Sequence, residues 1–157
     1  MKKILFLDID GVLNTDCQQW HCQMNGIAPV DRLGYAFDQK AVANLAAILS
    51  ATGAEIVISS SWKFLGLAAL RRIWDSRKLP GHILDVTPDN ESKGMEVADW
   101  LSQHGGQISN YAIIDDENDM LPEQQTHFVQ TNPQFGISKK NVEELLCYGW
   151  LKTSQDS

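Results

Sequence analysis

Short apolar runs alternate with helical patterns along nearly the whole chain, and this alternation limits the possible folds more than any other feature. Ile, Leu, Val and Phe dominate the apolar runs, as they do in buried strands. The runs are KILFLDI (3–9), AEIVISS (54–60), HILDV (82–86), NYAIIDD (110–116) and HFVQT (127–131). Patterns typical of helices cover residues 38–53, 64–78, 92–106 and 138–151. Strands that alternate with helices predict an α/β protein with a mostly parallel sheet and helices on both faces.

The chain is expected to form a single domain over residues 1–157. Its 157 residues, of which 43% are hydrophobic, suffice for one core, and no repeat, linker or low-complexity tract divides them. Asp38 and Ser138 are suited to be helix N-caps, and Gly53 is suited to end a helix. Only residues 15–38 form a long stretch without a clear pattern. Because this segment directly follows the first strand, it is expected to form a flap or minimal cap.

The charge balance and the apolar content argue against two classes of partner. The chain has 13 Lys and Arg residues against 20 Asp and Glu residues, a net charge of −7, so broad nonspecific nucleic-acid binding is not expected. The basic candidate is LRRIWDSRK (70–78), for which a solvated helix face is the alternative. The first apolar run breaks at Asp8, and no stretch approaches the roughly 18 apolar residues of a membrane helix. These features predict a cytoplasmic protein without a membrane partner.

The cysteines indicate a reducing compartment rather than a disulfide framework. There are three of them, Cys17, Cys22 and Cys147, at spacings that match no known framework. Cys17, His21 and Cys22 could be imagined as zinc ligands, but no fourth ligand stands at a familiar spacing. Free thiols are therefore the favoured interpretation.

Polar side chains follow three of the expected strands, at the point where each strand ends. They are Asp8 and Asp10 after the first strand, Ser59 and Ser60 after the second, and Asp115 and Asp116 after the fourth. In an open parallel sheet, ligands bind beyond the carboxyl ends of the strands. The sequence therefore predicts that these groups meet at one edge of the sheet.

Four carboxylates at one edge would repel one another strongly without a cation. Mg²⁺ resolves the repulsion, because it is held by carboxylate oxygens together with a substrate phosphate. One Asp could then attack phosphorus, and the Asp two residues further on, on the same side of a strand, could protonate the leaving oxygen and later activate water. An EF-hand interpretation of DIDGVLNTD (8–16) fails, because the glycine comes too early and no Glu stands at the twelfth position.

A phosphoryl group also needs hydrogen-bond donors and a fixed positive charge. A hydroxyl from Ser59 or Ser60 and the backbone N–H groups of the turn at Gly11 are the candidate donors. Lys93, at the start of the expected helix 92–106, is the candidate positive side chain. A surface lysine in a first helical turn is the alternative.

Four short motifs resemble those of the haloacid dehalogenase (HAD) superfamily, in the family's order. FLDIDGVLN (6–14) resembles the first motif, an apolar run followed by Asp-x-Asp-Gly, and VISS (57–60) resembles the second, a Ser or Thr after an apolar strand. Lys93 matches the third motif, and AIIDDEND (112–119) resembles the fourth, an apolar strand that ends in Asp-Asp. The whole pattern most resembles a subgroup of small HAD domains, some related to those attached to RNA-repair enzymes.

The resemblance implies a Rossmann-like α/β/α sandwich and a role for each motif residue. Asp8 would be the nucleophile and Asp10 the general acid/base, while Ser59 and Lys93 would bind the phosphoryl group. Dehalogenating members lack the second Asp of the first motif, so Asp10 points to phosphate chemistry. The implied metal ligands are Asp8, Asp10 through its backbone carbonyl, and Asp116, with Asp115 beside it and Asp119 as a further supporting group.

The resulting prediction is a Mg²⁺-dependent phosphomonoester hydrolase that works through an aspartyl-phosphate. The alternatives are a phosphotransferase and a catalytically silent phosphate- or protein-binding module. Without a large cap domain, the site is expected to be open to a small phosphomonoester, a nucleic-acid end or a phosphoprotein. Trp20, Tyr35 and Trp62 could stack on a ring of the substrate, although packing is the commoner use of such residues.

Overall fold

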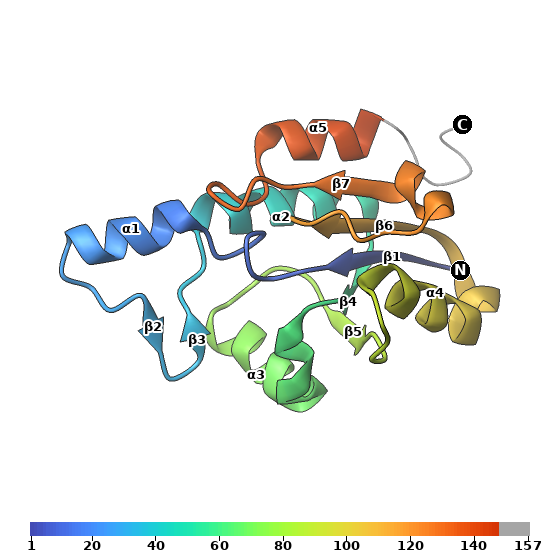
Figure 1. Ribbon diagram of the computed structural model, residues 1–157, viewed down its shortest axis with the longest axis horizontal. Coiled ribbons are helices and arrows are strands. Elements are labelled where there is room, and N and C mark those ends of the chain that lie inside the picture. Colours follow the sequence, from blue (N-terminus) through green and yellow to red (C-terminus); the bar gives the residue numbers. More distant parts are fainter. Residues whose placement is uncertain (148–157) are drawn as a thin grey trace.

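A five-stranded sheet forms the centre of the computed structural model, which describes residues 1–147. The strands lie in the order β5-β4-β1-β6-β7, and every neighbouring pair is parallel (Figure 1). Their bounds are β1 (Lys2–Leu7), β4 (Glu55–Ile58), β5 (Ile83–Val86), β6 (Ile108–Asp115) and β7 (Phe128–Gln130). Each strand falls on one of the expected apolar runs, so the parallel α/β prediction is confirmed.

Helices cover both faces of this sheet. One face packs against α2 (Gln39–Thr52), α3 (Leu67–Ser76) and α5 (Lys139–Cys147), and its apolar cluster includes Leu45, Leu70 and Leu145. The other face packs against α4 (Lys93–His104) through Val97 and Trp100. Alternate residues of each strand point to opposite faces, which is why near-continuous apolar runs supply both clusters. The Rossmann-like three-layer prediction is thereby confirmed.

One helix begins later than expected, and the expected end of another lies outside the described residues. The helix expected over 64–78 begins only at Leu67, because Gly66 has a φ of +92° and separates α3 from the short 3₁₀ helix η1 (Ser61–Leu65). The helix expected over 138–151 starts with Ser138 as its cap, whose Oγ accepts the Asn141 N–H at 3.2 Å. The last four residues of that range, 148–151, lie outside the described residues.

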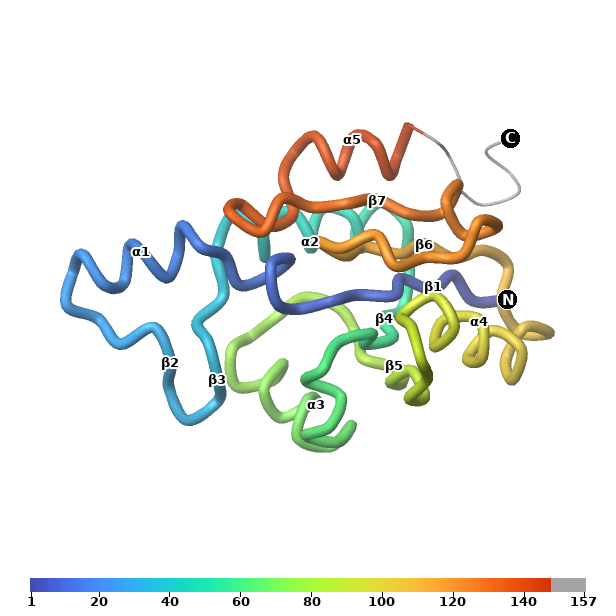
Figure 2. The backbone as a smooth tube through the Cα atoms, viewed as in Figure 1, coloured from blue at the N-terminus to red at the C-terminus, as the bar shows by residue number. Residues whose placement is uncertain are grey.

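The segment 15–38 is ordered as one helix and one hairpin beyond the carboxyl ends of the strands. Helix α1 (Asp16–Met24) comes first, and β2 (Val30–Asp31) and β3 (Gly34–Tyr35) form an antiparallel pair. Figures 1 and 2 show α1 extending away from the sheet and the hairpin returning toward α3. Within α1 only Cys22 is buried, so its sequence carries no apolar stripe that could have predicted a helix.

The order of the strands creates a crevice between β1 and β6. The chain passes from β1 to β4 and β5 on one side, and then returns to place β6 and β7 on the other side of β1. Ligands of such sheets bind at the point where the winding reverses. Two further 3₁₀ helices, η2 (Gly105–Gln107) and η3 (Pro122–His127), flank β6. Among residues 1–147, no helix has the length and apolar character needed to span a membrane.

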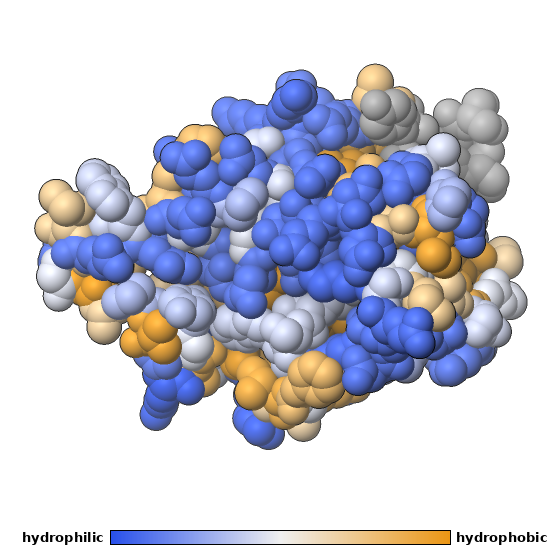
Figure 3. All heavy atoms as spheres, viewed as in Figure 1, coloured by the Kyte–Doolittle hydropathy of each residue, from blue (hydrophilic) through white to orange (hydrophobic). Residues whose placement is uncertain are grey.

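Figure 3 shows the surface of the same view. Apolar residues gather over η1 and α3 and over the hairpin, whereas hydrophilic residues dominate the surface above them. The prediction of a single domain over residues 1–157 remains a prediction.

Candidate active site

The ends of three adjacent strands are level with one another, and this register builds the site. Leu7 in β1 pairs with Ile58 in β4 and with Ile114 in β6. The next residue of each strand is therefore delivered to the same height at the carboxyl edge. These next residues are Asp8, Ser59 and Asp115, and all three are buried.

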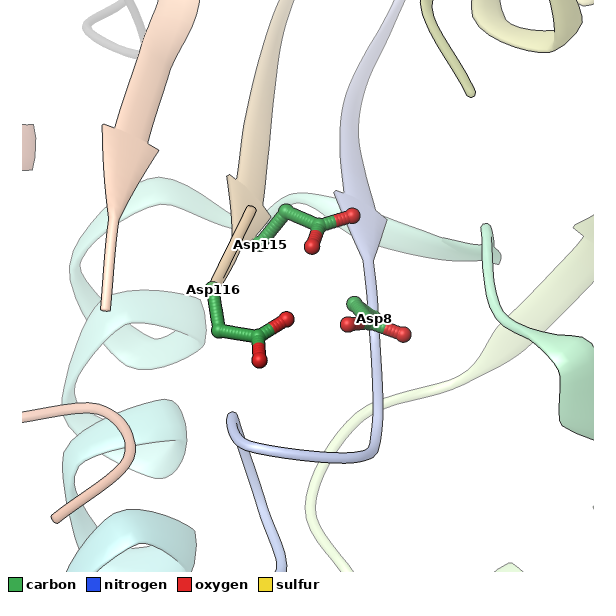
Figure 4. A group of neighbouring side chains, drawn as sticks. All are labelled: Asp8, Asp115 and Asp116. Atoms are coloured by element: carbon green, nitrogen blue, oxygen red, sulfur yellow. The ribbon is translucent and has the colours of Figure 1, made fainter. Parts of the chain in front are cut away.

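Three carboxylates converge in the crevice between β1 and β6. Asp8, Asp115 and Asp116 each offer an oxygen within 4.8 Å of the others. Figure 4 shows the three carboxyl groups pointing toward one another from the ends of the two strands. Within residues 1–147 this is the one group of His, Cys, Asp or Glu side chains arranged to hold a metal, so the zinc alternative at Cys17, His21 and Cys22 finds no support there.

The proximity of these carboxylates changes their acidity. Burial, together with the charge of Asp115, raises the pKa of Asp8 from 3.8 to about 8, although Lys93 opposes this rise. Burial and a hydrogen bond with Asp115 also raise the pKa of Asp116. Without a metal, the site therefore favours a protonated Asp8 at neutral pH. A hard divalent cation bound by oxygen ligands would remove that cost, and this donor set fits Mg²⁺.

Lys93 supplies the positive charge that the sequence predicted. Its Nζ lies 2.8 Å from Asp115 Oδ2 and 3.2 Å from Asp8 Oδ1. Burial lowers the pKa of Lys93, but the carboxylates of Asp8 and Asp115 outweigh this effect and raise it to about 12. The interpretation of Lys93 as an ordinary surface lysine is therefore excluded by its contacts.

The start of α4 holds Lys93 in place. Ser92 caps the helix by accepting the Met95 N–H, and the backbone carbonyl of Asp119 accepts the Gly94 N–H at 3.0 Å. A Cβ on Gly94 would lie 2.8 Å from the Leu121 backbone nitrogen, so only glycine permits this close approach. The loop after β6 thus fixes the start of the helix that carries Lys93, and Asp119 contributes to this through its backbone carbonyl.

The two serines after β4 have different surroundings. Ser59 Oγ is the one buried side-chain polar atom within residues 1–147 that has no hydrogen-bond partner. A buried hydroxyl without a partner is costly, so it indicates a group that a ligand completes. Ser60 Oγ instead accepts the Trp62 N–H at 3.2 Å and caps η1. This contrast favours Ser59 over Ser60 as the phosphate-binding hydroxyl.

Asp10 lies beside the carboxylate cluster but its side chain is not part of it. Strand β1 ends at Leu7, so the expectation that Asp10 projects from the same strand as Asp8 is wrong. Asp10 sits in a turn, where its Oδ1 accepts hydrogen bonds from Trp62 Nε1 at 2.9 Å and from Asn14 Nδ2 at 2.7 Å. Both donors bind the same oxygen, which leaves Oδ2 for a proton. Metal binding through the Asp10 carbonyl remains a prediction.

Gly11 makes the turn after β1 possible. It has a φ of +78°, and a Cβ there would lie 2.5 Å from Asp116 Oδ2. Its N–H donates to the Asn14 side chain at 3.1 Å and to the Asn14 carbonyl at 3.0 Å. A glycine is therefore required for the close approach of the turn to Asp116. Phosphate binding by Gly11 stays a prediction, because the Gly11 N–H donates to Asn14 in this structure.

Sequence reasoning missed the contacts that fix the loop after β4. Lys63 Nζ lies 2.7 Å from Glu96 Oε2, and both side chains are nearly fully buried. This ion pair joins η1, which carries Trp62, to α4, which carries Lys93. Its partners are 33 positions apart, and no motif or spacing in the sequence links them.

The hairpin of the 15–38 segment packs directly against Trp62. A Cβ on Gly34 would lie 2.6 Å from the Trp62 ring, and Phe37 packs against the same ring at 5.6 Å. Tyr35 lines a hollow of about 250 Å³ together with Asp10. Of the three aromatic candidates for stacking, Trp62 and Tyr35 thus lie at the site, whereas Trp20 lines a different hollow.

The comparison with protein families agrees with this geometry. Residues 4–142 match the family described as "HAD domain in Swiss Army Knife RNA repair proteins", which covers most of the chain. No curated protein matches the chain. HAD proteins are in general Mg²⁺-dependent phosphohydrolases, and the three-Asp cluster could bind such a metal. The matched range includes every predicted site residue, and the chain belongs to this family of HAD domains.

Proposed function

We propose that the protein is a Mg²⁺-dependent phosphomonoester hydrolase in which Asp8 is the nucleophile. The observation that carries the proposal is the position of buried Asp8 beside two complementary sets of groups. Asp115 and Asp116 offer oxygens that suit a cation. Lys93, whose Nζ contacts both Asp8 and Asp115, and the unpartnered hydroxyl of Ser59 suit the oxygens of a phosphoryl group.

The chain's own residues account for both halves of the reaction. An oxygen of Asp8 attacks phosphorus, the bond from phosphorus to the leaving oxygen breaks, and Asp10 gives that oxygen its proton. Asp10 then takes a proton from water as the water oxygen attacks phosphorus and the bond to Asp8 breaks. Lys93 and Ser59 hold the phosphoryl oxygens throughout. Mg²⁺, held by Asp8, Asp115 and Asp116 with the Asp10 carbonyl, would neutralise charge on the phosphoryl group.

Hydrolysis of 4-nitrophenyl phosphate tests the proposal. Purified protein should release nitrophenol with Mg²⁺, and EDTA should stop the release. The Asp8→Asn variant should be less active by about 10⁴-fold or more, because it lacks the nucleophile. Asp75→Asn is the matched control, since Asp75 is exposed on α3 and its side chain has no partner within the described residues. Activity that rises with an added alcohol acceptor would favour a phosphotransferase instead.

A second readout separates a selective enzyme from a silent one. Beryllofluoride mimics a phosphoryl group on an aspartate, so it should bind the wild-type protein with Mg²⁺ and should not bind Asp8→Asn. Beryllofluoride binding without turnover would indicate a competent site that rejects the aryl ester. If the protein shows no beryllofluoride binding and no turnover, the proposal is contradicted and the binding-module alternative is favoured.

A further inference from the structure

A groove lies next to the catalytic turn, between the hairpin and the η1–α3 corner. Its volume is about 510 Å³, and its lining includes Trp62, Phe64 and Leu65 with Arg32 and Arg72. Figure 3 shows the apolar surface of this region over η1 and α3 and over the hairpin. Neither the nucleophile nor the carboxylate cluster lines it, so it is separate from the phosphoryl site.

The apolar part of the groove is exposed but held firmly. Phe64 is 72% exposed and Leu65 is 56% exposed, although both are large apolar residues. The residues before them are anchored: Lys63 is buried in the ion pair with Glu96, and Ser60 caps the 3₁₀ helix. Single exposed apolar residues are ordinary, but an adjacent pair lining one hollow is typical of a binding surface.

Of the four arginine side chains in the described part of the chain, the two that line the groove have no partner there. Arg71 donates to backbone carbonyls of β5, and Arg77 donates to the carbonyls of Gly34 and Tyr35. The side chains of Arg32 and Arg72 have no hydrogen bond or ion pair with any residue among 1–147. Both are exposed, and both line the groove. In a chain of net charge −7, two unpaired arginine side chains that line one groove give it a local positive charge.

Trp62 connects the groove to the chemistry. Its ring lines the groove, while its Nε1 holds Asp10 Oδ1 at 2.9 Å. A general acid must lie within hydrogen-bond reach of the leaving oxygen, so the leaving group departs from beside Asp10. Asp10 itself lines the hollow of about 250 Å³, not the groove, and that hollow is also lined by Asp16 and Asp116, whose carboxylates would repel an anionic part of a leaving group.

We propose that this groove binds the leaving group of the phosphomonoester, and that the preferred leaving group carries a flat apolar ring and a second anionic group. The ring lies against Phe64 and the edge of Trp62, and the anion binds Arg32 and Arg72. This inference rests on the proposed function, because it names the substrate class of the same site.

Three primary alkyl phosphates test the groove while keeping the leaving oxygen similar. Propyl phosphate lacks a ring, naphthylmethyl phosphate adds a ring, and sulfonated naphthylmethyl phosphate adds a permanent anion. The wild-type kcat/KM should rise along this series. In Arg72→Gln and Arg32→Gln, the loss should be about fivefold to tenfold larger for the sulfonated ester than for the unsulfonated one, chiefly through KM. In Phe64→Ala, the loss should be larger for both naphthyl esters than for propyl phosphate.

Lys140→Gln on α5 is the matched control, because Lys140 is an exposed cation far from the groove lining. Equal losses on all three esters in the arginine variants would overturn the proposal. Binding of sulfonated naphthylmethanol, the released alcohol, gives a readout without turnover through naphthalene fluorescence. Binding weakened by Arg72→Gln but not by Lys140→Gln supports the groove even if no ester is hydrolysed, and unchanged binding overturns it.

Discussion

The side of the site proposed to bind the phosphoryl group (the phosphoryl side) and the side proposed to face the leaving group (the leaving-group side) are built in different ways. On the phosphoryl side, Asp8 follows β1, Ser59 follows β4 and Asp115 ends β6, and the register of the parallel sheet sets their positions. On the leaving-group side, Asp10 stands in a turn and depends on side-chain hydrogen bonds from Trp62 and Asn14. The first side is fixed by backbone ladders, and the second by contacts between loops.

This difference predicts how each side responds to substitution. A change on the phosphoryl side removes a charge or donor but leaves the backbone frame intact, so its effect should be the same for every substrate. A change on the leaving-group side should alter how well Asp10 is held, so its effect should depend on how much the leaving oxygen needs a proton. The following predictions test that distinction in order of decreasing effect.

The largest effect is expected for Lys93→Met. The phosphoryl oxygens lose their fixed cation, so kcat should fall by about 10²- to 10³-fold, equally for alkyl and aryl phosphates. Steady-state kinetics with propyl phosphate and 4-nitrophenyl phosphate would measure this. Lys139→Met, an exposed lysine at the start of α5, is the control and should retain activity. A loss confined to one class of ester would contradict the assignment of Lys93 to the phosphoryl side.

The pH dependence of Mg²⁺ binding should follow the raised pKa of Asp8. Because that pKa is about 8 in the metal-free fold against 3.8 for the free side chain, the folded state holds a proton that the unfolded state has lost. The metal-free fold should thus lose stability as pH rises from about 4 through 8. Mg²⁺ displaces the proton, so its affinity should rise by up to about tenfold per pH unit and level off above pH 8.

Thermal unfolding at increasing Mg²⁺ concentration, measured from pH 6 to pH 9, checks this prediction. The shift in midpoint at a fixed Mg²⁺ concentration should grow toward pH 8. Asp8→Asn should weaken the pH dependence and stabilise the metal-free protein above pH 8, because it removes the buried charge. A Mg²⁺ affinity that stays constant over this range would show that Asp8 is already ionised without the metal.

A smaller effect, confined to poor leaving groups, is expected for Trp62→Phe. The variant keeps a ring against Phe37 but removes the N–H that holds Asp10 Oδ1. Activity on propyl phosphate should fall by about tenfold to a hundredfold, while 4-nitrophenyl phosphate, whose leaving oxygen needs little protonation, should be nearly unaffected. Trp20→Phe, an exposed tryptophan, is the control, and equal losses on both esters would indicate a structural role only.

The same contrast explains which parts of the site the sequence could predict. Asp8, Asp115 and Ser59 were predictable because a buried parallel strand leaves an apolar run that stops at the residue it delivers. Lys93 was placed at the start of an expected helix, where the sequence left an ordinary surface lysine as the alternative, and Asp38 and Gly53 were placed correctly at the ends of α2. Local patterns thus carried the phosphoryl side.

The leaving-group side was predictable only in part. Asp10 was named from the sequence and its contact with Asn14 is local, but the hydrogen bond that Trp62 donates to it joins segments far apart in the chain. Trp62 and Asp10 are 52 positions apart, and neither lies in a periodic element that would orient it. The hairpin has strands of two residues each, which are too short for an alternating pattern. The position of Asp10 was predicted wrongly because residues two positions apart share a face only within a strand, and β1 ends at Leu7, before both Asp8 and Asp10.

The smallest effect is expected for Arg77→Gln, which tests whether the hairpin supports the leaving-group side. Arg77 donates to the carbonyls of Tyr35 at 2.8 Å and Gly34 at 3.2 Å and lies over the Phe37 ring, so it joins the hairpin to the end of α3. Without it, backbone amides of residues 30–36 should exchange faster with solvent, and kcat/KM for alkyl phosphates should fall by only about twofold to fivefold, since the strand-built side is untouched. Arg71→Gln is a matched control, because its contacts lie on β5. Faster exchange without any loss of activity on alkyl phosphates would show that the hairpin does not help to position Asp10. Trp62 and Asn14 would then be sufficient to hold it.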